Sequence, residues 1–271
     1  MADRLQKFKN KPLLGLRVLV TRGRASVHHF SNMLAEEGAE VIEIPTIEIK
    51  PLPLDPKGRK RLRQIGEYNW LVFSSSHAVE IFMKYLFQLR KTVRHMRGTK
   101  TACVGEATAR TLQSYGSRAD LIPGDYKQEG LMKCFQKVPL AGKRILIARA
   151  KEGREVLLDF LKQKKAVVDL WPLYKNLVPA GAKAKLQNLF AREGGVDLAI
   201  FASSSAVDHF YSLFSLAQRK KWLRGLPTAV IGPVTATSVC NWRGKVVIQP
   251  KKYTIPDLVK TICLWVKKVK K

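Results

Sequence analysis

The stretch PLLGLRVLVTR (residues 12–22) returns later in the chain as PLAGKRILIAR (residues 139–149). Further landmarks of the two halves fall into the same register: Pro45 with Pro172, TACVGEATARTL (101–112) with TAVIGPVTATSV (228–239), LIPGDY (121–126) with VIQPKKY (247–253) and, after one inserted residue, FSSSHAV (73–79) with FASSSAV (201–207). Because so many landmarks share one offset, we infer that residues 139–265 duplicate residues 12–138. A duplication of this length predicts two similar lobes, and we expect a cleft where the lobes face each other.

The composition agrees with two globular domains. The chain has 271 residues, 46% of them hydrophobic, which is enough for two cores. No apolar run approaches the roughly 18 residues that span a bilayer, and the N-terminal MADRLQKFKNK does not resemble a signal peptide. The four cysteines (Cys103, Cys134, Cys240, Cys263) show no CxxC spacing, so we expect reduced thiols and a cytoplasmic protein that does not contact a membrane.

The chain is strongly basic. Lysine and arginine total 49 against 21 aspartate and glutamate residues, which gives a formal net charge of +28 and an attraction for polyanions. The cations are spread along the sequence, with runs at 57–63, 162–165 and 218–224, and no zinc-finger spacing or RNP-like strand accompanies them. We therefore expect a basic, solvated surface without a specific nucleic-acid site. A cleft that collects a polyanionic small molecule is compatible with that surface.

Both halves alternate short β-branched segments with amphipathic helical ones. Strands are expected near 17–21, 39–45, 69–73, 101–105, 121–122, 144–148, 166–172, 197–201, 228–232 and 246–248. Helices are expected near 26–37, 74–87, 106–116, 130–136, 155–163, 203–214, 233–244 and 256–266, the first of them capped by Ser26 and ended by Gly38. This order predicts an α/β protein in which each lobe is a parallel β-sheet with helices on both faces.

Four of the expected helices begin with small polar residues directly after a strand. These junctions are 74–76 and 105–108 in the first half, and 203–205 and 232–235 in the second. Ligands of parallel α/β sheets bind beyond the carboxyl ends of the strands, and the amides of a helix N-terminus favour anions. Helix capping explains any single serine. Because both junctions occur twice, they predict a two-sided anion clamp.

Several other chemistries are excluded by their missing motifs. The sequence has no GxGxxG after a first strand, no P-loop and no GxSxG elbow. The five histidines show no metal-ligand spacing, and acidic residues are scarce and unpaired. His77 stands at a helix start, where a surface role and a ligand contact are both open. We expect a reaction or binding event that needs neither a metal nor a cofactor.

Six motifs in this order resemble the uroporphyrinogen-III synthase family. They are VTRG followed by GAEVIEIPTIEI, WLVFSSSHAV, VGEATARTL, LWPLY, IFASSSAVDHF and AVIGPVTATSV, and they span most of residues 16–260. The resemblance implies that a two-stranded linker at 46–52 and 170–178 joins two α/β domains. One domain would be 1–45 plus 179–271 and the other 53–169, whereas the repeat alone predicts a boundary near residue 138. A thin double linker is expected to act as a hinge.

The resemblance also implies a reaction. The family cyclises hydroxymethylbilane, a linear tetrapyrrole octacarboxylate, to uroporphyrinogen III with loss of water and inversion of ring D, without a cofactor. Tyr174 matches the family's cleft tyrosine and is expected to donate a proton to the leaving hydroxyl, although packing at the hinge is an alternative role. The residues expected to bind substrate are Ser75, Ser76, Gly105, Thr108, Ser203, Ser204, Gly232 and Thr235, with Arg22, Lys127 and Arg149 as weaker candidates for which a solvated charge is equally compatible. A transient contact with the preceding pathway enzyme is left open.

Two other classes of protein are compatible with the residues. One is a two-lobed protein that binds a polyanionic small molecule without catalysis, and turnover of hydroxymethylbilane distinguishes it from a synthase. The other is a nucleic-acid-binding protein on an α/β scaffold, for which a steep loss of DNA or RNA affinity with salt is expected. The resemblance does not account for the net charge of +28.

Overall fold

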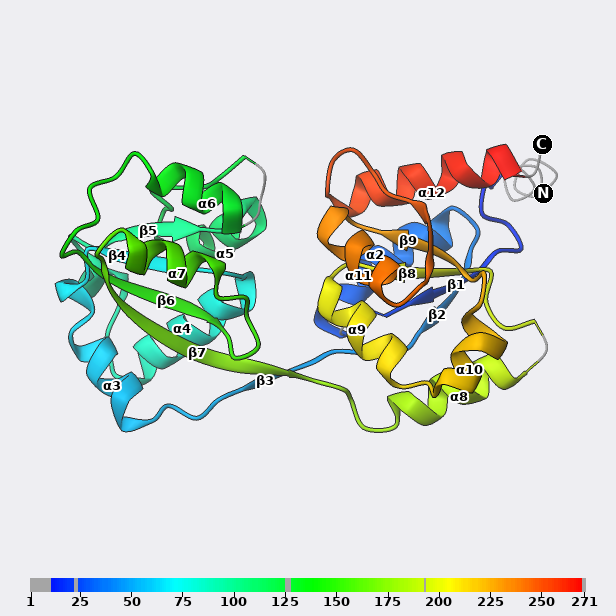
Figure 1. The fold of residues 1–271 in the computed structure, drawn as a ribbon, viewed down its shortest axis with the longest axis horizontal. Helices are drawn as coiled ribbons and strands as arrows, with labels where there is room; N and C mark the ends of the chain where they lie inside the picture. The colour runs from blue at the N-terminus through cyan, green and yellow to red at the C-terminus, as the bar shows by residue number, and fades with distance from the viewer. Residues whose placement is uncertain (1–10, 22–23, 125–127, 193, 270–271) are drawn as a thin grey trace, which may run out of the picture. The chain divides into compact units, whose positions relative to one another are not determined.

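The structure, a computed structural model, describes residues 11–21, 24–124, 128–192 and 194–269. The chain divides into two compact units: unit 1 is Met1–Glu48 with Leu177–Lys271, and unit 2 is Ile49–Asn176. The boundary near residue 138 that the repeat alone predicts is wrong, because each unit combines segments from both copies of the repeat. The two units are described separately below and are labelled in Figure 1.

Unit 1 contains a five-stranded sheet with the order β10-β9-β8-β1-β2. Its strands are β1 (Arg17–Val20), β2 (Glu40–Glu43), β8 (Leu198–Phe201), β9 (Pro227–Val230) and β10 (Lys245–Ile248), and their ladders are parallel. Its helices are α2 (Arg24–Glu36), α8 (Ala182–Ala191), α9 (Ser204–Ser212), α10 (Leu216–Gln218), the π-helical turn η3 (Arg219–Leu223), α11 (Pro233–Asn241) and α12 (Ile255–Val269).

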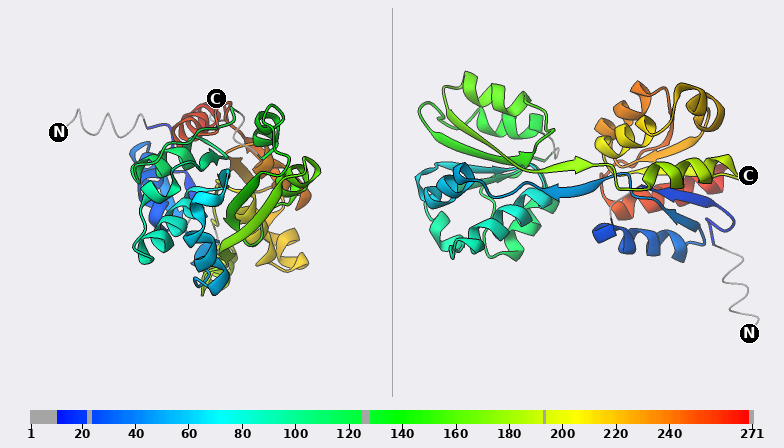
Figure 2. Two further views of the ribbon diagram at one scale, coloured as in Figure 1. Left: turned by 90° about the vertical axis from the view of Figure 1, so that its left-hand side faces the viewer. Right: turned by 90° about the horizontal axis from the view of Figure 1, so that it is seen from below.

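Helices cover both faces of this sheet because alternate strand residues point to opposite sides. Leu19 and Phe201 pack with Phe210 of α9 and Val239 of α11. Val20 points the other way, into a core formed with α2 and α12. The right-hand view of Figure 2 shows α9 and α11 on one face of the sheet and α2 and α12 on the other.

Unit 2 contains a second five-stranded sheet, with the order β3-β7-β6-β4-β5. Its strands are β3 (Glu48–Pro51), β4 (Trp70–Phe73), β5 (Lys100–Cys103), β6 (Arg144–Ala150) and β7 (Val167–Leu177), and the β4–β5, β4–β6 and β6–β7 ladders are parallel. Its helices are α3 (Pro56–Arg63), η1 (Ile65–Glu67), α4 (Ser76–Gln88), η2 (Val93–Met96), α5 (Glu106–Ser114), α6 (Gln128–Phe135) and α7 (Val156–Gln163).

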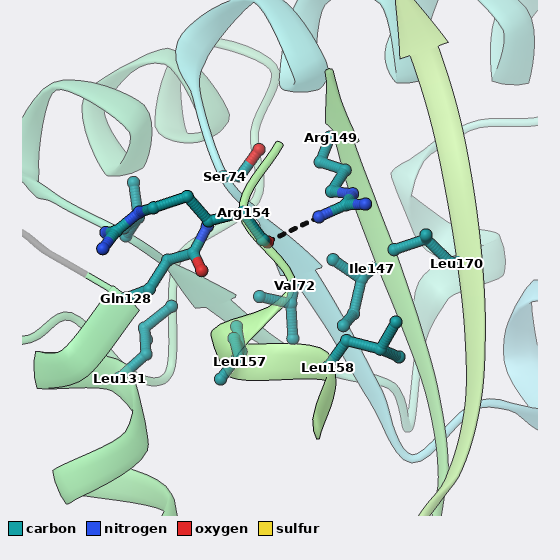
Figure 3. Close-up of a pocket in the computed structure, with 11 residues that line it drawn as sticks. Val72, Ser74, Gln128, Leu131, Ile147, Arg149, Arg154, Leu157, Leu158 and Leu170 are labelled. Atoms are coloured by element: carbon teal, nitrogen blue, oxygen red, sulfur yellow. Dashed lines mark hydrogen bonds between the residues drawn. The ribbon is translucent and has the colours of Figure 1, made fainter. Parts of the chain in front are cut away.

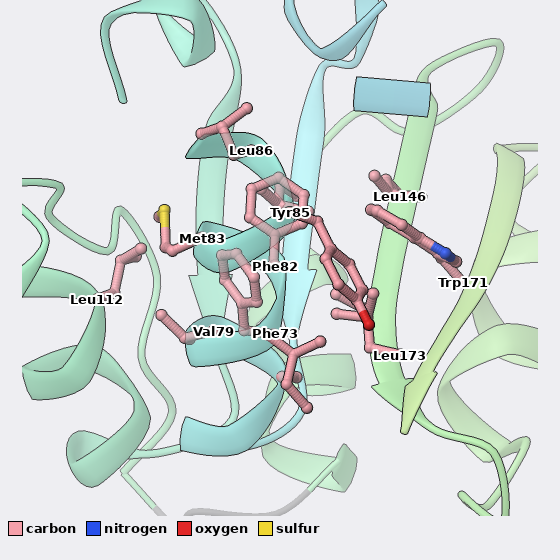
Figure 4. Close-up of a cluster of buried hydrophobic side chains, with 14 of the residues drawn as sticks. Phe73, Val79, Phe82, Met83, Tyr85, Leu86, Leu112, Leu146, Trp171 and Leu173 are labelled. Atoms are coloured by element: carbon pink, nitrogen blue, oxygen red, sulfur yellow. The ribbon is translucent and has the colours of Figure 1, made fainter. Parts of the chain in front are cut away.

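The unit 2 sheet also has a core on each face. Phe73 of β4 meets Phe82 of α4 edge to face, with ring centroids 5.3 Å apart, in the core that includes α5 (Figure 4). Ile147 of β6 points to the opposite core, which contains Leu131 of α6 and Leu161 of α7. The predicted fold class is confirmed: both units are α/β sandwiches with parallel strands.

The internal duplication is visible in the strand order. The order β2-β1-β8-β9-β10 in unit 1 corresponds to β7-β6-β4-β5 in unit 2, and β3 extends the unit 2 sheet beyond β7. The strand expected at 121–122 is wrong: Leu121 makes only an isolated parallel bridge to Ala102, where β10 stands in unit 1. Pro123 follows at once and has no N–H with which to extend a ladder.

Helix ends differ in detail from the expectations. α2 begins at Arg24, so Ser26 lies inside it and is not its cap, whereas Gly38 follows its end with φ +99°. α3 was not expected because its cationic sequence has no apolar period, yet Asp55 caps it through the Gly58 N–H at 2.7 Å. In the part of the chain that is described, no helix has the length and apolarity required to cross a membrane.

Candidate functional site

Two serines begin helices at equivalent places in the two units. Ser75 follows β4, and its Oγ accepts a hydrogen bond from the backbone N–H of Ala78 at 3.1 Å, in the first turn of α4. Ser203 follows β8 and caps α9 in the same way, through the N–H of Ala206 at 3.2 Å. Each serine therefore stabilises its helix, which is the capping role open to it on sequence grounds.

Two glycines begin the neighbouring helices without a side-chain cap. Gly105 is the N-cap residue of α5 and Gly232 that of α11, and neither helix start has a side chain that accepts from its N–H groups. N–H groups in the first turns of both helices thus have no capping side chain at the N-cap position, although Pro233 itself has no N–H. Thr108 and Thr235 lie in the first turns of these helices and are each 4% exposed.

Tyr174 lies beside the first of these serines. Its phenolic oxygen is 2.9 Å from Ser75 Oγ, and the residue is 5% exposed. The backbone places it there, because Tyr174 pairs with Ala150 where β6 ends and its carbonyl accepts from the Lys151 N–H at 2.7 Å. Tyr174, within β7 and opposite the last residue of β6, therefore meets Ser75, which follows the carboxyl end of β4 on the other side of β6.

Burial controls the protonation state of this phenol. Desolvation is the largest influence and raises the pKa of Tyr174 above its ordinary value; the Ser75 hydrogen bond opposes the rise, and the charge of Glu152 adds to it. Ser75 lowers the pKa because a hydroxyl that donates to the phenolic oxygen stabilises the phenolate. With a pKa above 10, Tyr174 is a phenol at neutral pH and can donate a proton.

His77 contacts the ring of this tyrosine. Its ring meets the Tyr174 ring edge to face, with centroids 6.1 Å apart. Its Nδ1 is 3.1 Å from Glu80 Oε2, and both side chains are more than one third exposed. His77 therefore has a surface partner in Glu80 and also contacts the ring of the buried tyrosine. The surface role considered from the sequence has a geometric basis, and a contact with a ligand stays a prediction.

Arg149 is not a solvated charge, contrary to the alternative considered for it. It is 4% exposed, and its Nη1 donates to the carbonyl oxygens of Gly153 at 2.9 Å and Arg154 at 2.6 Å. Figure 3 shows the second of these bonds above a hollow in the unit 2 face. The side chain thus holds the loop between β6 and α7.

The expected site residues divide between the two units. Unit 2 holds Ser75, Ser76, Gly105, Thr108, Arg149 and Tyr174, and unit 1 holds Ser203, Ser204, Gly232 and Thr235. The serines, glycines and threonines lie where parallel strands end and helices begin, whereas Arg149 lies near the end of β6 and Tyr174 within β7. Arg22 and Lys127 lie outside the described residues. Among the described residues, no group of three His, Cys, Asp or Glu side chains could hold a metal ion.

Sequence reasoning missed some polar residues at this end of unit 2. Arg154 makes a two-pronged ion pair with Glu129, with Nη1–Oε1 at 2.6 Å and Nη2–Oε2 at 3.2 Å. Gln128 stands beside it at the start of α6. No motif connects a helix residue with a loop residue 25 positions away, so no signal in a single sequence could have found this pair.

Comparison with known proteins shows which family the chain belongs to. The model of the family described as uroporphyrinogen-III synthase HemD matches residues 28–260. The uroporphyrinogen-III synthase of Synechococcus elongatus is 31% identical over 263 residues, 94% of this chain and 97% of that protein. A structure of mutant uroporphyrinogen III synthase from the extremely thermophilic bacterium Thermus thermophilus shares the fold at a TM-score of 0.71 and 16% identity, covering 94% of this chain and all of that one. The resemblance drawn from the six motifs is thereby confirmed, and the chain belongs to the uroporphyrinogen-III synthase family.

Proposed function

We propose that this protein converts hydroxymethylbilane to uroporphyrinogen III, with loss of water and inversion of ring D. Family membership supports the reaction, and the contact between Tyr174 and Ser75 supports a place for the chemistry. The reaction needs a group that assists the departure of a hydroxyl and a surface that fixes a flexible polyanion. The residues at the strand ends offer both.

In this proposal Tyr174 is the proton donor. The bond between the terminal methylene carbon and its hydroxyl oxygen breaks, the electron pair stays with the oxygen, and the phenolic proton completes a water molecule. Electrons from the pyrrole nitrogen stabilise the carbon that is left. The substituted α-carbon of ring D bonds to this methylene carbon and gives a spiro intermediate. The older bond from that ring carbon to the methylene of ring C then breaks, and the free α-carbon of ring D bonds to the released methylene. This α-carbon finally loses its proton, which returns to the phenolate, so the enzyme is unchanged after one turnover.

Ser75 prepares this proton for transfer. Its Oγ already accepts the Ala78 N–H, and its own hydrogen is free to point at the Tyr174 oxygen 2.9 Å away. The phenolic hydrogen can then point to the substrate instead of the serine. In the same orientation Ser75 stabilises the transient phenolate, which burial alone would disfavour.

The helix starts hold the substrate's carboxylates. The uncapped N–H groups in the first turn of α5 and those after Pro233 in the first turn of α11, with the Thr108 and Thr235 hydroxyls, are suited to anions. Each hydrogen bond to a carboxylate contributes about 1.5–3 kcal/mol. Ser76, Ser203, Ser204, Arg22, Lys127 and Arg149 are proposed as further contacts. Fixing the bilane in this way selects the inverted ring closure over head-to-tail closure in solution.

Product analysis tests the function. The protein is incubated with freshly prepared hydroxymethylbilane, and the oxidised porphyrins are separated by isomer. We expect the type III isomer well above the type I background that forms spontaneously. If the folded protein yields only the type I isomer, it is no synthase, and a binding protein without catalysis becomes the better account.

A further inference from the structure

Two segments of unit 2 that lie apart in the sequence form one basic surface. Residues 56–66 contain α3 and the start of η1, and residues 89–98 contain η2. The hydroxyl of Thr99 donates to the carbonyl oxygen of Ile65 at 2.9 Å, and Lys91 Nζ donates to that of Arg63 at 3.4 Å. The two segments therefore lie side by side, and we name them together the α3–η2 surface.

Positive charge is concentrated on this surface. Nine of its 21 residues are lysine or arginine and none is aspartate or glutamate, whereas the whole chain has 49 lysine and arginine residues among 271. The surface is thus more than twice as rich in cations as the chain on average, so the general excess of basic residues does not explain it. The nine cations are Lys57, Arg59, Lys60, Arg61, Arg63, Arg90, Lys91, Arg94 and Arg97.

Most of these charges have no partner of opposite sign. Among the residues that the structure describes, Arg61 is the one member of the nine with a carboxylate oxygen within 4.0 Å, its Nη2 lying 4.0 Å from Asp169 Oδ1. Arg59 and Arg63 are both exposed and stand four positions apart on α3, where like charges destabilise a helix. A bound polyanion removes this repulsion, so the surface is suited to one.

The α3–η2 surface lies away from the site of the proposed reaction. η1 leads into β4 and η2 into β5, so the surface is at the amino ends of these strands, whereas Ser75 and Gly105 follow their carboxyl ends. Each of the two strands has four residues and therefore spans about 13 Å. A substrate held at the helix starts does not neutralise these cations, which indicates a second, separate anionic partner.

The composition of the surface indicates which polyanion it fits. Its apolar side chains Leu62, Ile65 and Met96 are buried, Leu89 and Val93 pack against the same core, and neither segment contains Phe, Tyr or Trp. A protein partner is bound around an apolar or aromatic centre, a bilayer by exposed apolar side chains, and a single nucleic-acid strand by aromatic stacking. Phosphates on the outside of a duplex need only cations, and the planar fork of arginine matches them.

We propose that the α3–η2 surface binds the phosphodiester backbone of a nucleic-acid duplex without reading its sequence. This agrees with the lack of a base-reading motif in the chain. It also gives part of the net charge of +28 a role that the synthase reaction does not require. The two activities are independent, because a duplex at the amino ends of β4 and β5 leaves their carboxyl ends open to substrate.

The salt dependence of duplex binding tests the proposal. The full chain is titrated against a fluorescein-labelled DNA duplex of about 20 base pairs, and anisotropy is measured between about 50 and 300 mM KCl. The logarithm of the affinity falls by about 0.9 per neutralised phosphate for each unit of the logarithm of salt concentration. The combined variant Lys60→Gln, Arg63→Gln, Arg94→Gln and Arg97→Gln should lower this slope by about three to four and weaken binding at least about 100-fold near 100 mM salt.

A matched variant separates this surface from the general charge of the protein. Four exposed lysines of unit 1 are substituted together, which removes the same charge: Lys183→Gln, Lys185→Gln, Lys260→Gln and Lys268→Gln. We expect affinity within about threefold of the parent protein, since screening weakens distant charges. Equal losses in the two variants, or an unchanged slope in the α3–η2 variant, overturn the proposal.

Folding and charge are checked in the same series. Thermal unfolding and formation of the type III isomer should be unchanged in both variants, because the substituted side chains are exposed and lie outside the proposed catalytic and substrate-binding residues. Arg63→Lys, Arg94→Lys and Arg97→Lys together keep the charge and should keep the salt slope, whereas Arg97→Gln alone should lower it by about one. If the fourfold α3–η2 variant unfolds early, these two milder variants decide.

Other polyanions give the remaining outcomes. A duplex RNA of the same length replaces the DNA, and the tighter of the two identifies the source of the phosphates. Poly-L-glutamate and vesicles that contain phosphatidylserine stand for an acidic protein and a membrane. If the α3–η2 variant loses affinity for one of these and keeps its affinity for both duplexes, the surface serves that partner and the proposal is wrong.

Discussion

Ser75 Oγ lies 2.9 Å from the phenolic oxygen of Tyr174 while it also accepts the N–H of Ala78 at 3.1 Å. One hydroxyl thus caps α4 and contacts the group proposed to donate the proton. Because the cap fixes the position of Oγ, the backbone at the start of α4 fixes the position of the phenol as well. The equivalent serine of unit 1, Ser203, provides a helix cap at the corresponding strand end.

Tyr174→Phe removes the proton donor and little else. The phenylalanine ring fits the same space, so stability should change by about 1 kcal/mol at most, the usual contribution of one hydrogen bond. We expect kcat to fall by about 100-fold, at the lower end for a general acid, with a small change in KM. Initial rates of type III formation measure this. A variant that folds normally and keeps full kcat would exclude Tyr174 as the donor.

Ser75→Ala and Ser203→Ala separate capping from catalysis. Both remove an N-cap acceptor, so each should lower the free energy of unfolding by about 1 kcal/mol, measured by chemical denaturation. Only Ser75 contacts Tyr174, so kcat should fall in Ser75→Ala and change little in Ser203→Ala, where KM is the affected constant. Equal losses of kcat in both variants contradict a specific role of Ser75 beside the phenol.

The pH dependence of kcat reports on the same phenol. Burial raises the pKa of Tyr174 above 10, so the donor stays protonated throughout the neutral and moderately alkaline range. We expect kcat to have no alkaline limb from this group below about pH 10. In Ser75→Ala the opposing hydrogen bond is lost, so the Tyr174 pKa should rise further, which absorbance titration near 295 nm would detect. A Tyr174 that titrates below pH 10 contradicts the assignment.

The strands, the helix caps and the strand order could be predicted from particular residues of the sequence. Apolar strands such as WLVF and LAIF precede serine caps, and the duplication carries the strand order from one unit to the other. The repeat alone did not predict the domain boundary. Each unit combines segments of both copies, and no local sequence pattern marks where the chain passes from one unit to the other. The Glu129–Arg154 pair depends on how the loop before α7 packs against the start of α6, and no spacing in the chain encodes that.

Two buried tyrosines provide a last, stability-based prediction. Tyr68 donates to Asp169 Oδ2 at 2.6 Å, whereas the hydroxyl of Tyr211 is buried without a partner. Tyr68→Phe should therefore lower the free energy of unfolding, by about 1–3 kcal/mol, because the Asp169 carboxylate loses a donor. Tyr211→Phe removes an unsatisfied polar group and should leave stability equal or raise it by about 1 kcal/mol.

The ionisation of Tyr211 makes stability depend on pH in the alkaline range. Burial raises the pKa of Tyr211 to about 12, above the ordinary value near 10. The folded state therefore favours the neutral phenol, and its contribution to stability is complete below pH 10 and is lost as pH rises toward 12. Tyr211→Phe has no phenol to ionise, so its advantage over the parent protein should widen between pH 10 and 12, measured by urea unfolding at each pH. A constant difference across that range would show that Tyr211 ionises equally easily in the folded and unfolded chain.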